Sequence, residues 1–171
     1  MREVLEAYPG AQRALFRQYH IGGCSHCGFQ PDETLEEVCR RNAGLDPQAV
    51  LDHIKTSHEE DMKILIEPKE LDAWLKQDSS IQLVDVRSRE EFEAVHISGA
   101  VLLSQDVMRG IMGDGSNSRP LVIIDHHGGQ GLDAAAYFKG HGLQNVRCLR
   151  GGIDAWATEV DPKIKRYRMS A

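Results

Sequence analysis

An apolar tetrapeptide that runs directly into a glycine-rich turn constrains this chain more than any other feature. The segment Leu121–Ile124 is followed by the turn 125–131, which reads Asp-His-His-Gly-Gly-Gln-Gly, and a helical pattern follows from Leu132. A strand, a tight loop and a helix in this order bring the loop amides and the helix N-terminus to one point. The stretch therefore predicts an α/β fold with an anion or nucleophile site on the loop.

Alternating strand and helix patterns extend this prediction to the last two thirds of the chain. Strands are expected at 63–66, 81–86, 100–103, 121–124 and 145–149. Helices are expected at 68–76, 89–95 and 106–112, and from residues 132 and 153. Short continuous apolar strands separated by helices are typical of a mainly parallel sheet. We therefore expect an α/β domain over residues 61–171, ending in a basic tail.

The first sixty residues show helical periodicity instead. Helices are expected at 3–8 and 9–19, after a capping box at Thr34 and Glu37, and after the N-cap pair Asp46-Pro47. The acidic run 56–61 closes this region as a helix end or a linker. The sequence thus predicts a three-helix module over residues 1–60, a size at which a single core is marginal.

Charge and hydropathy exclude several classes of partner. The 171 residues are 41% hydrophobic and carry a formal net charge of −6, with a pI near 5.7. This acidic balance argues against nucleic acid or an anionic membrane as the main partner. No apolar run approaches the roughly eighteen residues that cross a bilayer, and the N-terminus lacks a secretory signal pattern. A cytoplasmic protein with a protein partner is expected.

The loop stretch, taken with three further segments, resembles the rhodanese domain of sulfurtransferases. The matching segments are Leu83–Arg87, His96–Ala100 and Gly151–Trp156, in the same order and spacing. The resemblance implies a nucleophilic cysteine directly after the strand and an arginine five residues later. This chain has Asp125 and Gln130 at those positions. The resemblance therefore implies the rhodanese fold without conventional thiosulfate sulfurtransferase activity.

The chemistry of a carboxylate at position 125 leads to the same expectation. Sulfur transfer needs a soft thiolate, whereas Asp125 offers a hard anion that the loop amides and the positive helix end would stabilise. Asp125 as a hydrolase nucleophile, or as a metal ligand with His126 and His127, is the alternative. Two solvent-facing histidine rings are expected. The candidate loop site comprises Asp125, His126, His127, Gly128, Gly129, Gln130 and Gly131.

Cys24 and Cys27 form a Cys-x-x-Cys pair after two glycines, and they are the candidate reactive thiols. Such a pair forms a disulfide, carries a persulfide, or binds zinc or an iron–sulfur cluster. Further ligands would come from His20, His26 or Cys39, and a homodimer would supply four thiolates from two pairs. The alternative is two free cysteines in a reduced turn.

The same region resembles a small helical domain found beside hybrid-cluster proteins and called a disulfide redox domain. The matching segments are 8–11, 20–28, 34–35 and 44–46. It is also distantly similar to the N-terminal domain of iron–sulfur repair proteins, in which the two cysteines are adjacent. These resemblances imply a redox or metal role for the first third of the chain.

Other prominent residues are assigned structural roles. Cys148, Trp74 and Trp156 are expected in the core, and His96 is expected to be a hydrogen-bonded structural histidine. The resemblance implies that Asp85 and Arg87 support neighbouring loops, whereas Arg109 and Arg150 are candidates to approach the loop site. The basic tail 161–168 is expected to be a solvated end, with a docking peptide as the less favoured alternative.

Three functional hypotheses follow. The first is a rhodanese-like accessory protein that acts in thiol redox, persulfide or iron–sulfur and metal handling through Cys24 and Cys27. The second is a non-catalytic regulatory or protein-interaction module. The third is a hydrolase that uses Asp125.

Overall fold

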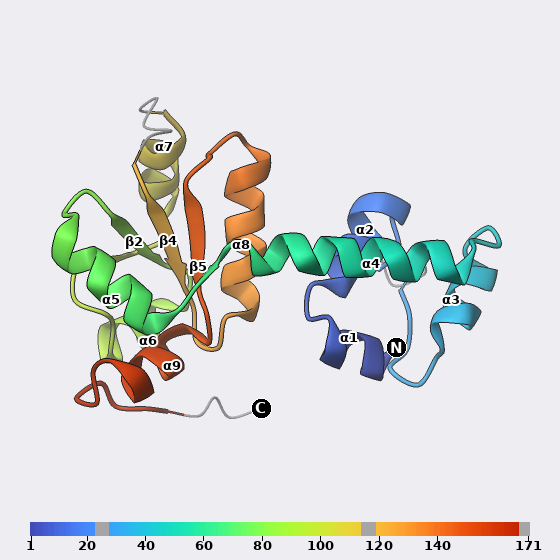
Figure 1. The fold of residues 1–171 in the computed structure, drawn as a ribbon, viewed down its shortest axis with the longest axis horizontal. Coiled ribbons are helices and arrows are strands. Elements are labelled where there is room, and N and C mark those ends of the chain that lie inside the picture. The colour runs from blue at the N-terminus through green and yellow to red at the C-terminus, as the bar shows by residue number, and fades with distance from the viewer. Residues whose placement is uncertain (23–27, 114–118, 168–171) are drawn as a thin grey trace. The chain divides into compact units, whose positions relative to one another are not determined.

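The structure, a computed structural model, describes residues 1–22, 28–113 and 119–167 (Figure 1). The chain divides into two compact units, Met1–Lys63 and Ile64–Ala171. Within the described ranges, no helix is both long enough and apolar enough to span a bilayer.

The N-terminal unit is helical. Its described helices are α1 (Arg2–Ala7), α2 (Ala11–Tyr19), α3 (Leu35–Arg41) and α4 (Pro47–Met62). They enclose a core of small and branched apolar side chains, which includes Leu15, Val38 and Ile54. A partly buried ion pair ties α2 to α4, because Arg13 lies 2.5 Å from Asp61. The helix expected at 3–8 is α1, so the described part of this unit has four helices in place of the predicted three-helix module.

The predicted N-terminal caps explain where two of these helices begin. The Thr34 hydroxyl accepts from the Glu37 amide at 3.2 Å, and the Glu37 carboxylate accepts from the Thr34 amide at 2.8 Å. The Asp46 carboxylate accepts from the Gln48 amide at 3.1 Å. Each cap satisfies backbone donors that have no partner inside the helix. The segment 56–61 continues α4 as regular helix.

The C-terminal unit alternates strands and helices, as the sequence predicts. Its strands are β1 (Leu65–Ile66), β2 (Gln82–Asp85), β3 (Ala100–Leu102), β4 (Leu121–Ile124) and β5 (Val146–Leu149). Its described helices are α5 (Pro68–Gln77), α6 (Arg89–Ala94), α7 (Gln105–Gly113), α8 (Gly129–Gly140) and α9 (Gly152–Glu159). A second capping box, at Ser88 and Glu91, starts α6.

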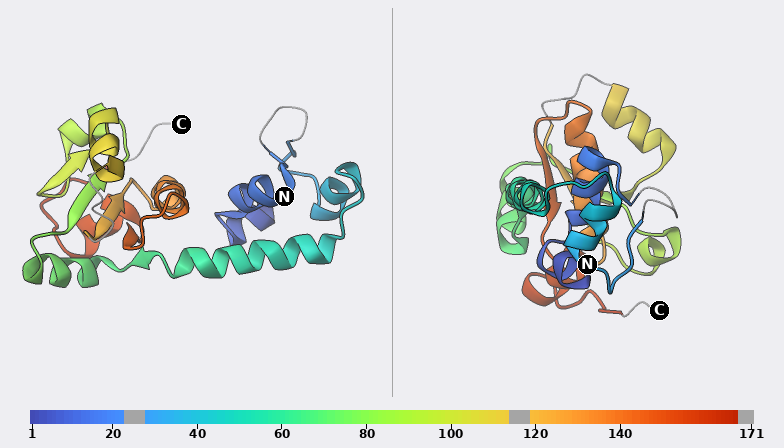
Figure 2. Two further views of the ribbon diagram at one scale, coloured as in Figure 1. Left: turned by 90° about the horizontal axis from the view of Figure 1, so that it is seen from above. Right: turned by 90° about the vertical axis from the view of Figure 1, so that its right-hand side faces the viewer.

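All five strands are parallel and lie in the order β1-β5-β4-β2-β3. The predicted parallel sheet is therefore confirmed, with β4 at its centre (Figure 1). Its side chains alternate between two cores, with Leu121 and Ile123 on one face and Val122 and Ile124 on the other. Helices α7 and α8 cover the first face and α5, α6 and α9 the second (Figure 2).

The carboxyl ends of parallel strands share one edge of the sheet, where α/β proteins place their binding sites. Three segments meet at this edge. The turn after β2 holds Arg87, the loop after β4 begins at Asp125, and the turn after β5 holds Gly151 and Gly152.

Candidate functional site

The loop after β4 folds around its first side chain. Asp125 is 3% exposed, and its carboxylate accepts hydrogen bonds from the backbone amides of Gly128 and Gly131, the latter at 2.8 Å. Gly131 lies in the first turn of α8, so the carboxylate also faces the positive end of that helix. The loop amides and the helix N-terminus are thus already engaged by an anion that the chain supplies itself.

The loop backbone is held against the start of α9. The carbonyl oxygen of Asp125 accepts from the Ile153 amide at 2.8 Å, and that of His126 accepts from the Asp154 amide at 3.2 Å. Gly152, at φ +58°, makes this approach possible, because a Cβ there would lie 2.5 Å from the His126 carbonyl oxygen. Backbone contacts to α9, together with the Asp125 side chain, therefore fix how the loop leaves the strand.

The floor of the loop is closely packed. A Cβ on Gly131 would lie 3.0 Å from the Cys148 sulfur and 3.2 Å from the Asp125 carboxyl carbon. Cys148 is completely buried, as the sequence predicts. Its thiol lies beneath the loop and is part of the core on the α7 and α8 face.

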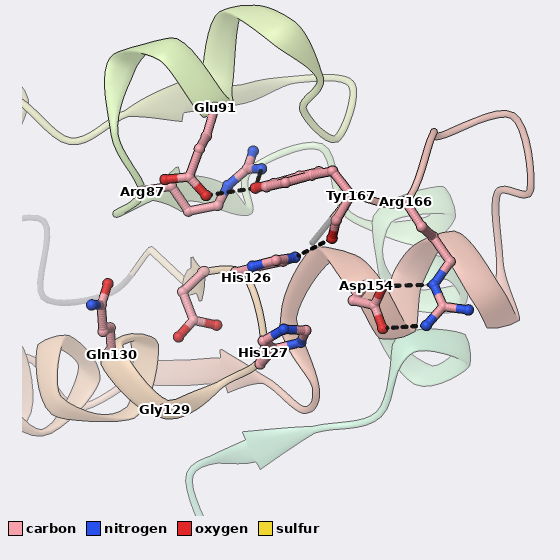
Figure 3. Close-up of a pocket in the computed structure, with 10 residues that line it drawn as sticks. Arg87, Glu91, His126, His127, Gly129, Gln130, Asp154, Arg166 and Tyr167 are labelled. Atoms are coloured by element: carbon pink, nitrogen blue, oxygen red, sulfur yellow. Dashed lines mark hydrogen bonds and ion pairs between the residues drawn. The ribbon is translucent and has the colours of Figure 1, made fainter. Parts of the chain in front are cut away.

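The two adjacent histidines differ in environment. The His126 ring stacks on His127 with centroids 3.9 Å apart and on Tyr167 at 4.3 Å, and Figure 3 shows it between them. His126 is 8% exposed, whereas His127 is exposed. The expectation of two solvent-facing rings is therefore wrong for His126, because the C-terminal segment covers it.

The tautomer of His126 follows from its contact with this segment. Nε2 lies 3.1 Å from the Tyr167 carbonyl oxygen, which only accepts, so Nε2 carries the proton. Nδ1 is buried and has no hydrogen-bond partner among the described residues. The ring is thus held by stacking and by one backbone contact.

Arg87 is the buried cation of the site. Its guanidinium forms a two-pronged ion pair with Asp85, at 2.9 Å and 2.6 Å, and donates to the Val95 carbonyl oxygen at 2.8 Å. These contacts tie the ends of β2 and α6 together. Burial opposes the charge, but the hydrogen bonds to Asp85 and Tyr167 raise the pKa of Arg87. Arg87 therefore stays protonated, and Asp85 balances its charge beneath the cavity.

The C-terminal segment contacts the site through Arg166 and Tyr167, so the prediction of a solvated end is wrong for Tyr167, whereas Pro162, Lys163 and Lys165 are exposed as predicted. Arg166 pairs with Asp154 through two contacts, at 2.6 Å and 2.8 Å. The Tyr167 hydroxyl accepts from Arg87 at 2.6 Å and donates to Glu91 at 2.7 Å. Sequence reasoning missed Glu91, Asp154, Arg166 and Tyr167, since their partners are far away in the chain.

These contacts shift the pKa values of the groups involved. Burial and the hydrogen bond to Glu91 raise the pKa of Tyr167 to about 12. Burial acts to raise the pKa of Glu91, yet hydrogen bonds from Tyr167 and Ser88 lower it overall. The hydrogen bonds from Arg166 lower the pKa of Asp154. At neutral pH, Glu91 and Asp154 are therefore ionised and Tyr167 is protonated.

A cavity of about 760 Å³ lies among these residues (Figure 3). Its lining consists of Arg87, Glu91, Asp125, His126, His127, Gly129, Gln130, Asp154, Arg166 and Tyr167. The other two candidate arginines have partners elsewhere, because Arg109 pairs with Asp106 at 2.9 Å and Arg150 pairs with Glu67 at 2.5 Å.

The N-terminal candidates are described only in part. Cys24, His26 and Cys27 lie outside the described residues. His20 ends α2 in the left-handed conformation, and Cys39 is completely buried in the helical core. Burial raises the pKa of the Cys39 thiol. Within the ranges that the structure covers, no three His, Cys, Asp or Glu side chains are arranged to hold a metal ion.

Comparison with known proteins agrees with the architecture. Residues 67–159 match the rhodanese-like domain family. The thiosulfate sulfurtransferase GlpE of Shewanella oneidensis is 36% identical over 77 residues, which cover 45% of this chain and 76% of that protein. The adenylyltransferase and sulfurtransferase UBA4 of Candida albicans is 27% identical over 173 residues, which cover 94% of this chain. This chain spans only 38% of the length of that protein.

Solved structures show the same fold. The reduced Bacillus anthracis protein CoADR-RHD superimposes with a TM-score of 0.52 at 19% identity, over 72% of this chain and 22% of that one. A rhodanese-like domain from Anabaena gives a TM-score of 0.50 at 19% identity, over 63% of this chain and 92% of that one. At this identity the likeness concerns the fold alone.

Proposed function

The chain belongs to the rhodanese-like domain family, and from this premise we propose that it is an accessory protein without conventional thiosulfate sulfurtransferase activity. The observation that carries the proposal is the Asp125 carboxylate, which accepts hydrogen bonds from the Gly128 and Gly131 amides at the nucleophile position. A carboxylate has no sulfur with which to accept a sulfane sulfur. The loop is therefore proposed to be inactive in sulfur transfer.

The charges around the loop support this proposal. An anionic donor such as thiosulfate would meet the negative charge of Asp125. Arg87 is neutralised by Asp85 and Arg166 by Asp154, while Gln130 adds no charge. Binding a second anion at Arg87 would require its buried pair with Asp85 to break, which is costly, whereas the pair of Arg166 with Asp154 is exposed.

We assign the thiol chemistry of the protein to Cys24 and Cys27, acting in redox, persulfide or iron–sulfur and metal handling. The chain has four cysteines, and the other two, Cys39 and Cys148, are completely buried. Reactive cysteines need solvent access and an environment that stabilises the thiolate. Burial works against both, so the Cys-x-x-Cys pair is the better candidate.

Anaerobic purification followed by measurement of iron, zinc, sulfide and reactive thiols tests this assignment. We expect bound metal, a persulfide or a reversible disulfide, and we expect Cys24→Ser and Cys27→Ser to abolish it. Ser25→Ala, which lies between the two cysteines, is the matched control and should behave like the wild-type chain. Unchanged metal content, sulfur uptake and redox titration in Cys24→Ser would refute the assignment.

A thiosulfate-to-cyanide sulfurtransferase assay tests the inactive loop. The wild-type chain should show no turnover, and Asp125→Cys should show little, because a charged guanidinium is lacking at position 130. Asp125→Cys combined with Gln130→Arg should gain at least tenfold over Asp125→Cys alone. The variants are assayed after reduction, since Cys148 lies beneath the loop. Full activity of Asp125→Cys alone would show that the arginine is unnecessary.

A hydrolase that uses Asp125 remains a weaker candidate. A nucleophilic carboxylate must reach the substrate, whereas Asp125 is 3% exposed and both of its oxygens face backbone amides. Turnover of a generic phosphate ester that is lost in Asp125→Asn would establish this activity instead.

A further inference from the structure

The last described segment of the chain, residues 161–167, contacts the cavity in the way a bound peptide contacts a groove. We call this segment the tail. Its Arg166 side chain is held by Asp154, and its Tyr167 side chain is held by Arg87, Glu91 and His126 (Figure 3). Two consecutive side chains are thus recognised by separate groups of the domain.

The domain contacts the ring, the hydroxyl group and the backbone carbonyl of Tyr167. Its ring lies nearly parallel to the His126 ring, with 6° between the planes. Its hydroxyl is bracketed by Arg87, at 2.6 Å, and Glu91, at 2.7 Å. Its backbone carbonyl accepts from His126 Nε2 at 3.1 Å. A phenylalanine would lose the hydroxyl contacts and an aliphatic residue would also lose the stacking, so this part of the groove selects tyrosine.

The contacts to Arg166 select a cation of a particular shape. Both oxygens of Asp154 meet the guanidinium, at 2.6 Å and 2.8 Å. Such a two-pronged contact is specific for arginine, because the ammonium group of lysine offers no planar fork. The groove therefore selects a peptide in which an arginine is followed directly by a tyrosine.

The tail is held in a way that allows release. The Arg166 side chain is 61% exposed, and exposed ion pairs add little to stability. Within the tail, Ile164 packs against the core cluster that includes Trp156. Most of the contacts of Arg166 and Tyr167 are thus polar and reversible.

We propose that the carboxyl edge of the sheet is a recognition groove for an extended peptide with adjacent arginine and tyrosine, and that the tail is its autoinhibitory occupant. The partner is a protein segment of this chemistry, which competes with the tail for Asp154, Glu91, Arg87 and His126. The proposal is independent of the role of Asp125 and of the Cys-x-x-Cys pair.

Tethering explains why the tail would control access. A segment joined by a short connection is present at an effective concentration of about 1 mM. A free peptide that binds the empty groove with a Kd of ~0.1 mM would therefore appear about tenfold weaker while the tail is in place. Releasing the tail should restore the stronger binding.

The test uses a synthetic peptide with the sequence of residues 161–167 and a fluorescent label at its N-terminus. Its binding to the full chain is measured. The double variant Arg166→Ala/Tyr167→Ala should bind the peptide about tenfold more tightly than the wild-type chain. The control variant Lys163→Ala/Lys165→Ala alters two exposed tail cations and should bind like the wild type. Peptides carrying Arg166→Lys or Tyr167→Phe should bind more weakly than the native peptide.

A charge exchange tests the contact to Asp154. The Asp154→Arg chain should reject the native peptide and bind the Arg166→Asp peptide. Hydrogen exchange provides a measurement on the unaltered chain, because excess peptide should increase deuterium uptake in residues 161–167 by displacing the tail.

Three results would overturn the proposal. The first is a folded double variant that fails to bind the peptide. The second is equal binding to the double variant and the wild-type chain. The third, which applies even if the double variant does not fold, is deuterium uptake of the tail that excess peptide leaves unchanged.

Discussion

Gly152→Ala tests whether backbone contact between the loop and α9 holds the site in shape. Gly152 has φ +58°, and an added Cβ would lie 2.5 Å from the carbonyl oxygen of His126 and against that of Asp125. The left-handed conformation costs a residue with a Cβ about 1–2 kcal/mol. The close contact adds about 1–3 kcal/mol, as overpacking does. We therefore expect a loss of about 2–5 kcal/mol in the free energy of unfolding.

Gly142→Ala is the matched control. Gly142 also has a positive φ, +100°, but no atom lies within 4 Å of its added Cβ. Only the conformational cost of about 1–2 kcal/mol applies there. The difference between the two variants, about 1–3 kcal/mol, isolates the contact between α9 and the loop.

Urea unfolding, monitored by tryptophan fluorescence, measures the loss of stability in both glycine variants. The chain has two tryptophans, Trp74 and Trp156, and both lie in the C-terminal unit. The transition therefore reports on that unit without interference from the helical unit. Linear extrapolation of each curve gives the free energy of unfolding in water. If Gly152→Ala lay within about 0.5 kcal/mol of Gly142→Ala, the contact would not hold the loop.

Three further predictions concern the same unit. Arg87→Ala leaves Asp85 buried without its counter-charge and should lower the free energy of unfolding in urea by about 3–5 kcal/mol. The control Arg150→Ala removes an exposed ion pair and should lower it by no more than about 1 kcal/mol. Burial is the main reason why the pKa of Tyr167 rises from 10.0 to about 12 in the folded chain. The stability that protonated Tyr167 contributes is therefore complete below pH ~10 and is lost as the pH rises toward about 12. Phenolate absorbance should show one of the four tyrosines ionising late, and Tyr167→Phe should remove that step. Ser88→Ala removes the cap of α6 and should lower the free energy of unfolding by about 1 kcal/mol, with an equal loss in Ser88→Gly arguing against a capping role.

Local patterns predicted the elements of this fold well. The capping box at Ser88 and the apolar run Leu121–Ile124 each involve residues a few positions apart, and both appear in the structure as predicted. The burial of Cys148 follows from its place in a strand of a two-sided sheet. Periodicity and capping are short-range signals, so a single sequence is enough to read them.

The site was harder to predict, because its contacts join distant parts of the chain. Tyr167 meets Arg87, 80 positions earlier, and His126, 41 positions earlier. No local pattern in the tail records these partners, and a short basic segment at the end of a domain is usually solvated. The difference between His126 and His127 has the same origin, since only the docked tail buries the first ring.

The sheet order also sets when this unit can fold. Strand β1 pairs only with β5 within the described sheet, and the register joins Leu65 to Cys148, 83 positions apart. Strands β1 and β2 are joined in the sheet only through β5 and β4, and both of these strands come late in the chain. Closing loops of this length slows folding. During translation, the apolar side chains of β1 and β2 therefore remain exposed until β4 and β5 have left the ribosome.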